Sequence, residues 1–137
     1  MGLGLRRRIS KLVGYDSRNW LRVRQHEAFG EFLRSRTGPV LEISPGQGSP
    51  WRRMCSDYKE LHFPDFDICS DALDEHFDVV IADQVLEHVS SPNCAIRNMR
   101  SMLGSGGAIA VATPFLFRVH GRPDDYYRWT PSGMRTL

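Results

Sequence analysis

The stretch that decides the fold runs from Val40 to Gly48 and reads VLEISPGQG. Its first four residues predict a short, buried strand of the kind found inside parallel sheets. The strand passes directly into a glycine-containing turn, and Ser49-Pro50 then offers an N-cap and a first helical residue. A strand, a glycine-rich turn and a helix in this order are typical of α/β domains that bind nucleotide-like ligands, because Gly46 and Gly48 let a ligand approach the backbone.

Two common nucleotide-binding loops do not fit this turn. The dinucleotide fingerprint needs a third glycine three residues after Gly48, where the chain has Trp51. A Walker loop needs Gly-Lys-Ser or Gly-Lys-Thr, and neither follows the turn. The turn therefore argues against NAD and excludes a Walker-type phosphate site.

Outside this stretch, the chain alternates between strand and helix patterns. A hydroxyl residue precedes a proline at three good helix starts, Ser49-Pro50, Ser91-Pro92 and Thr130-Pro131. Apolar runs predict further strands at 60–63, 77–82 and 108–113. Continuous apolar strands separated by helices predict an α/β fold, with a Rossmann-like, mostly parallel sheet and helices on both faces.

The front of the chain differs from the rest in charge. Residues 1–36 carry nine Lys or Arg and three acids, whereas residues 37–137 carry nine and thirteen. We assign 1–36 to a basic helical segment, in which Asp16 or Ser17 caps the second helix and Arg22 is solvated, and 37–137 to the α/β domain. Basic helices of this density are usually solvated faces, so we do not expect a nucleic-acid partner.

Composition narrows the class of protein further. The 137 residues suit one domain, and no apolar run approaches the roughly 20 residues that a membrane-spanning helix needs. The three cysteines, Cys55, Cys69 and Cys94, are odd in number and lack CxxC spacing. This pattern indicates reduced thiols in a cytoplasmic protein and argues against a disulfide framework or a zinc site.

Four segments, taken in order, resemble those of the class I S-adenosylmethionine-dependent methyltransferases, in particular the methyltransferase type 11 domain family. They are VLEISPGQG at 40–48, FDVVIADQVLEHV at 77–89, LGSGG at 103–107 and TPF at 113–115. The resemblance implies an enzyme that moves a methyl group from S-adenosylmethionine to a small molecule, lipid or glycan precursor. A catalytically silent methyltransferase-like module for binding or assembly is the alternative.

The resemblance also implies cofactor contacts at the carboxyl ends of the strands. Glu42 would lie near the methionine amino group, and an acid after the second strand would accept both ribose hydroxyls. Spacing does not choose between Asp65 and Asp67 for this acid; we favour Asp67, because Pro64 can end the strand early and Ile68 can flank the adenine. The other implied contacts are Ser44, Gly46, Gly48, Asp83 and Gln84.

Methyl transfer from a sulfonium asks a site to align the reactants and to remove a proton when the acceptor is a hydroxyl. His88, His120 and Asp83 are the candidate bases. Glu87 and the two histidines resemble the metal cluster of RNA 3′-terminal ribose methyltransferases, but Gln84 stands where such a site would place another carboxylate. We therefore expect no metal.

The segment 118–129 mixes cations, acids and aromatic residues without periodicity. Together with the residues that follow, it resembles the substrate-covering loop of type 11 relatives, which often read Asp-Tyr-x-Arg-x-Thr-x-x-Gly as residues 125–133 do here. A loop held down by the packing of its own aromatic residues is the alternative.

Two departures from the family pattern stand out. Ser44 replaces the first turn glycine, and only 28 residues separate Gly48 from Phe77, which leaves no room for the helix and strand that the family inserts there. The chain also stops at Leu137, inside the last expected helix. We expect a shortened class I methyltransferase fold that lacks the usual last strands, and a homodimer that covers the sheet edge left open.

Overall fold

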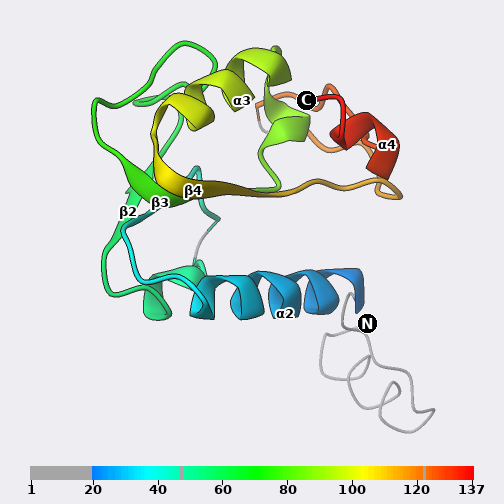
Figure 1. The fold of residues 1–137 in the computed structure, drawn as a ribbon. Helices are drawn as coiled ribbons and strands as arrows, with labels where there is room; N and C mark the ends of the chain where they lie inside the picture. The colour runs from blue at the N-terminus through cyan, green and yellow to red at the C-terminus, as the bar shows by residue number, and fades with distance from the viewer. Residues whose placement is uncertain (1–19, 47, 122) are drawn as a thin grey trace, which may run out of the picture.

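The computed structural model describes residues 20–46, 48–121 and 123–137 (Figure 1). The caps expected at Asp16 or Ser17 lie outside these residues. The main helices and strands are α2 (Trp20–Arg34), β1 (Val40–Ile43), β2 (Tyr58–Leu61), β3 (Phe77–Asp83), α3 (Pro92–Ser101), β4 (Leu103–Ala112) and α4 (Pro131–Met134), with two short 3-10 helices, η1 (Trp51–Arg53) and η2 (Leu86–His88).

The sheet has four parallel strands in the order β2-β1-β3-β4. Val40, the first residue of β1, lies opposite Tyr58 of β2 and Val79 of β3. Among the described residues, no helix or strand lies between β2 and β3, as the short spacing predicted. The parallel α/β sheet expected from the sequence is confirmed.

Helices cover both faces of this sheet (Figure 1). Leu41 and Ile43 point to the face that carries α3, where they share a buried cluster with Met99. Val40 and Val79 point to the opposite face, where they pack with Leu33 of α2 and with Trp51. Because successive side chains of a strand point to opposite faces, the sheet has one hydrophobic core on each side. Each fully buried apolar side chain stabilises the fold by roughly 1.5–3 kcal/mol.

The three Ser-Pro or Thr-Pro helix starts have different outcomes. α4 begins as expected, with the Gly133 N–H donating to Thr130 Oγ1 at 3.0 Å, and α3 begins at Pro92. The helix expected from Pro50 is wrong, because only the three-residue η1 forms there. Only nine residues separate Gly48 from β2, and Trp51 is held in the core at 1% exposure, so the chain turns into β2 before a helix can extend.

The start of β4 also differs from the expectation of a strand from residue 108. Leu103 already pairs with Phe77, and the register then shifts so that Ala108 pairs with Val79. The glycine turn is thus a bulge within the strand. Gly106 has a φ of 76°, and a Cβ on Gly107 would meet the Phe77 carbonyl oxygen at 2.9 Å. Glycine is therefore needed here on both conformational and steric grounds.

No helix in the described ranges combines the length and the apolar character needed to cross a membrane.

Candidate functional site

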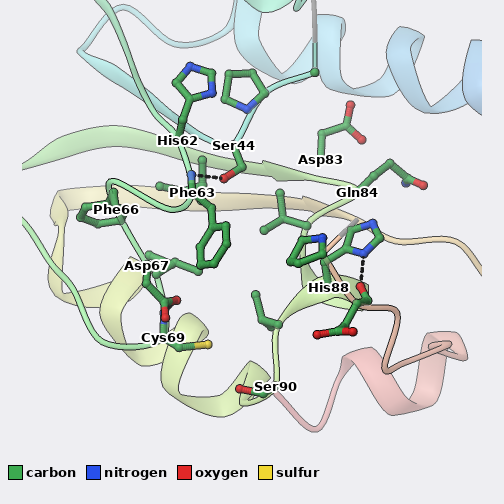
Figure 2. A pocket seen from close by; sticks show the side chains of 18 of the residues that line it. Ser44, His62, Phe63, Phe66, Asp67, Cys69, Asp83, Gln84, His88 and Ser90 are labelled. Carbon is green, nitrogen blue, oxygen red and sulfur yellow. Dashed lines mark hydrogen bonds between the residues drawn. The ribbon is translucent and has the colours of Figure 1, made fainter. Parts of the chain in front are cut away.

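A cavity of about 920 Å³ lies at the carboxyl ends of the strands (Figure 2). Its volume falls at the upper end of the roughly 300–1,000 Å³ usual for ligand pockets. Ser44 and Gly46 reach it from the end of β1, and His62 and Phe63 from the end of β2. The rest of the wall comes from Arg22 of α2, the segment 66–69, the end of β3, the connection through η2 to α3 and the loop at 123–126. This is the edge at which parallel α/β sheets bind ligands.

Most of the site residues predicted from the sequence meet at this cavity, and four do not. Its lining includes Ser44, Gly46, Asp67, Ile68, Asp83, Gln84 and His88. Glu42, Gly48, Asp65 and His120 are outside the lining.

Glu42 is buried at 3% exposure on the α2 side of the sheet. Its carboxylate accepts hydrogen bonds from the Ser49 hydroxyl at 2.5 Å and from the Tyr58 hydroxyl. Burial raises the pKa of Glu42, and these two hydroxyl donors oppose the rise. Glu42 therefore ties β1 to β2 and to the turn before η1, and its side chain is engaged away from the cavity.

Asp83 ends β3 and is held by α2. Its carboxylate forms an ion pair with Arg22 and accepts a hydrogen bond from Gln25 Nε2 at 2.5 Å, and its side chain is only 5% exposed. His26 lies near it, and burial together with the charge of Arg22 lowers the pKa of this histidine. Arg22, which we expected to be solvated, instead lines the cavity. The pattern of apolar and charged residues along α2 does not predict that Arg22 lies at the cavity.

Two non-glycine residues at the strand ends have left-handed backbones. Ser44 follows β1 with a φ of 46°, and Gln84 follows β3 with a φ of 61°. Such conformations cost about 1–3 kcal/mol each and are found most often at functional sites. Ser44 Oγ accepts a hydrogen bond from the Phe63 N–H at 3.2 Å, and the Gln84 N–H donates to the Ala112 carbonyl at 2.8 Å. Both turns are held by neighbouring strand ends.

Asp67 and Asp65 differ in position. Asp67 lines the cavity, and its Oδ1 accepts a hydrogen bond from the Cys69 N–H at 2.9 Å, whereas Asp65 is exposed outside the lining. The residue directly after β2 is His62, which also lines the cavity. The sequence reasoning missed His62, because it placed the second strand two residues too late.

The loop expected to cover the substrate contributes Pro123, Asp124 and Tyr126 to the cavity wall. It is anchored by Asp125, whose carboxylate receives the His120 N–H at 2.7 Å and the Arg128 guanidinium at 2.6 Å. The Arg128 guanidinium holds the pKa of Asp125 well below its usual range. Asp125 therefore fixes both ends of the loop that closes this side of the cavity.

Comparison with known proteins identifies the fold. The sequence model described as a methyltransferase domain matches residues 5–132. The DhpI-SAH complex is similar in structure, with a TM-score of 0.56 and 17% identity over 86% of this chain and 76% of that one. The glycopeptide N-methyltransferase MtfA has a TM-score of 0.47 and 16% identity over 76% of this chain and 61% of that one. No curated protein matches the chain.

The family match covers most of the chain and confirms the resemblance predicted from the sequence, the type 11 domain being a close relative of the family that matches. The likeness to the DhpI-SAH complex confirms the Rossmann-like fold class.

Proposed function

We propose that the chain, which belongs to the methyltransferase domain family, binds S-adenosylmethionine in the cavity at the strand ends and transfers its methyl group to a small molecule. The observation that carries the proposal is the meeting, at one cavity, of Ser44 from the end of β1, Asp67 from the β2–β3 connection and Asp83 from the end of β3. For the methyl acceptor we propose a small molecule, a lipid or a glycan precursor.

The residues of the cavity fit this cofactor. Asp67 supplies a carboxylate for ribose hydroxyls, and Ile68 and Phe66 supply an apolar wall for an adenine ring. The methionine end of the cofactor carries one positive and one negative group, and Asp83 and Arg22 place opposite charges side by side. When bound, the cofactor supplies an electrophilic methyl group, and the protein has to orient the acceptor towards it.

Of the three predicted bases, His88 is best placed to take a proton from an acceptor. It lines the cavity, and its Nδ1 lies 2.5 Å from the Asp124 carbonyl oxygen. A carbonyl only accepts, so Nδ1 carries the proton and Nε2 keeps its lone pair. Asp83 also lines the cavity, but its carboxylate is ion-paired with Arg22. His120 is outside the cavity lining, and its ring contacts that of His88 at a centroid distance of 4.9 Å.

Isothermal titration of the purified chain with S-adenosylmethionine and with S-adenosylhomocysteine tests the proposal. We expect saturable binding of one cofactor per chain. A silent module is favoured by the burial of Glu42 away from the cavity. No heat with either compound at millimolar concentration would exclude the proposed cofactor, whereas binding without methyl transfer to any acceptor would favour the silent module.

Two further expectations belong to this proposal. The described cysteines, Cys55, Cys69 and Cys94, are all free thiols, which suits a reducing, cytoplasmic setting. The outer edge of β4 has no partner strand among the described residues, which suits pairing with a second copy. Both remain predictions.

A further inference from the structure

Three metal-ligating side chains, Glu87, His88 and His120, converge beside the cavity. Glu87 and His88 belong to η2, whereas His120 comes from the loop that follows β4. One ligand atom of each residue lies within 4.8 Å of the others, and the described residues contain no second group of this kind. The fold thus brings together two imidazoles and a carboxylate from distant parts of the chain.

Glu87 is the most unusual member of the cluster. Its side chain is completely buried, and neither carboxylate oxygen has a hydrogen-bond partner. Oε1 lies 3.8 Å from His88 Nε2, which is too long for a hydrogen bond. Buried carboxyl groups are normally hydrogen-bonded, ion-paired or bound to a metal. Packing alone therefore gives no account of a glutamate at this position.

Both histidines are held in the way that metal ligands usually are. Nδ1 of His88 lies 2.5 Å from the Asp124 carbonyl oxygen, which can only accept a hydrogen bond. Nδ1 of His120 lies 3.2 Å from Asp125 Oδ2 and 3.3 Å from the Arg118 carbonyl oxygen, both of which are acceptors. Each ring is thus oriented through Nδ1 and keeps the lone pair of Nε2 for a ligand bond. Such outer partners fix the tautomer and orientation of metal-binding histidines.

We propose that Glu87, His88 and His120 bind one divalent transition-metal ion, through a carboxylate oxygen and two Nε2 atoms. Two imidazoles and one carboxylate suit Zn²⁺ and its neighbours such as Co²⁺ and Mn²⁺, whereas Mg²⁺ prefers a shell of oxygen atoms. Three protein ligands are enough for a site that keeps open positions. The glutamine at position 84, on which the expectation of no metal was based, therefore does not exclude this site.

The location of the cluster indicates what the open positions would face. His88 lines the cavity, so an exogenous ligand of the ion would lie where the methyl acceptor is proposed to bind. An oxygen ligand on such an ion has a lowered pKa. The ion would then replace His88 Nε2 as the means of activating a hydroxyl acceptor. This consequence rests on the proposed function, whereas ion binding itself does not.

The test is metal binding by the full chain after treatment with a chelator, measured without S-adenosylmethionine. Zn²⁺ is titrated by calorimetry, and Co²⁺ is followed by its visible absorption, which reports nitrogen and oxygen ligands. We expect one ion per chain and little competition from Mg²⁺. Because cofactor is absent, failure of this experiment would leave the proposed function standing, and failure of cofactor binding would leave the metal site standing.

Four variants separate a metal site from a structural cluster. Asp125→Asn, which alters the partner of His120, should weaken Zn²⁺ binding roughly 10- to 100-fold. Glu87→Gln and His120→Asn, which remove ligands, should weaken it more. His62→Asn is the matched control, because His62 lines the same cavity but lies outside the cluster, and it should bind Zn²⁺ as the wild type does.

Melting temperatures with and without Zn²⁺ distinguish the loss of a metal ligand from a general loss of stability. Glu87→Gln preserves shape and removes a buried, unpaired carboxyl group, so the metal-free variant should melt at or above the temperature of the metal-free wild type. Added Zn²⁺ should raise the melting temperature of the wild type but not of this variant. If Glu87→Gln does not fold, His120→Asn, in a partly exposed loop, carries the comparison. A wild type that binds no ion, or a His120→Asn variant of unchanged affinity, would overturn the proposal.

Discussion

Asp67→Asn is the substitution that most directly tests the proposed cofactor site. Asp67 Oδ1 already accepts the Cys69 N–H, so one carboxylate oxygen is left for the ribose hydroxyls. Asparagine can retain the bond to Cys69 through its own oxygen and would present an NH₂ group to the ribose. The variant therefore loses about one charge-assisted hydrogen bond, which is worth roughly 1.5–3 kcal/mol. This corresponds to a loss of about 10- to 150-fold in affinity.

Titration calorimetry with S-adenosylhomocysteine measures this loss, and Asp65→Asn is the matched control. Asp65 is exposed outside the cavity lining, so its substitution should change the dissociation constant less than about twofold, as expected for a screened surface charge. Thermal melting of both variants separates a local effect on the cofactor from a general loss of stability. Equal losses of affinity in the two variants, or no loss in Asp67→Asn, would refute the assignment.

Three further predictions concern stability and assembly. Gly107→Ala should lower the free energy of unfolding, measured by urea titration, by about 1–3 kcal/mol, because the added Cβ would meet the Phe77 carbonyl oxygen at 2.9 Å. Gly46→Ala is the control: nothing lies within 4 Å of its added Cβ, so the free energy of unfolding should change by less than about 0.5 kcal/mol. Glu42 has a pKa raised by burial above the ordinary 4.5, so its contribution to stability is fully present below pH 4.5 and is lost as the pH rises through the raised pKa. The free energy of unfolding of the wild type, measured by denaturation at several pH values, should therefore increase relative to that of Glu42→Gln as the pH falls. If the difference between the two proteins stays constant with pH, the raised pKa is contradicted. Light scattering at tens of micromolar should give twice the 15.7 kDa chain mass, and a cooperatively melting monomer would rule out the homodimer.

The sequence predicted the elements whose patterns are local. The apolar run of β3 and the proline start of α3 were placed within one or two residues of their observed bounds. Errors arose where tertiary packing overrides the local pattern. Trp51, buried against the α2 side of the sheet, belongs to a short 3-10 turn although Ser49-Pro50 is a good helix start. The role of Arg22 depends on where α2 crosses the end of β3, and no local pattern encodes that crossing.

The position of Glu42 illustrates a signal that the sequence did contain. Side chains alternate between the two faces of a strand, so Glu42 must point away from the face occupied by Leu41 and Ile43. Those two residues pack on the α3 side, and Ile43 also lines the cavity. The parity of β1 therefore places Glu42 on the α2 side of the sheet, where the Ser49 and Tyr58 hydroxyls engage its carboxylate. In this chain the charges that face the proposed methionine end belong instead to Asp83 and Arg22, at the end of β3 and on α2.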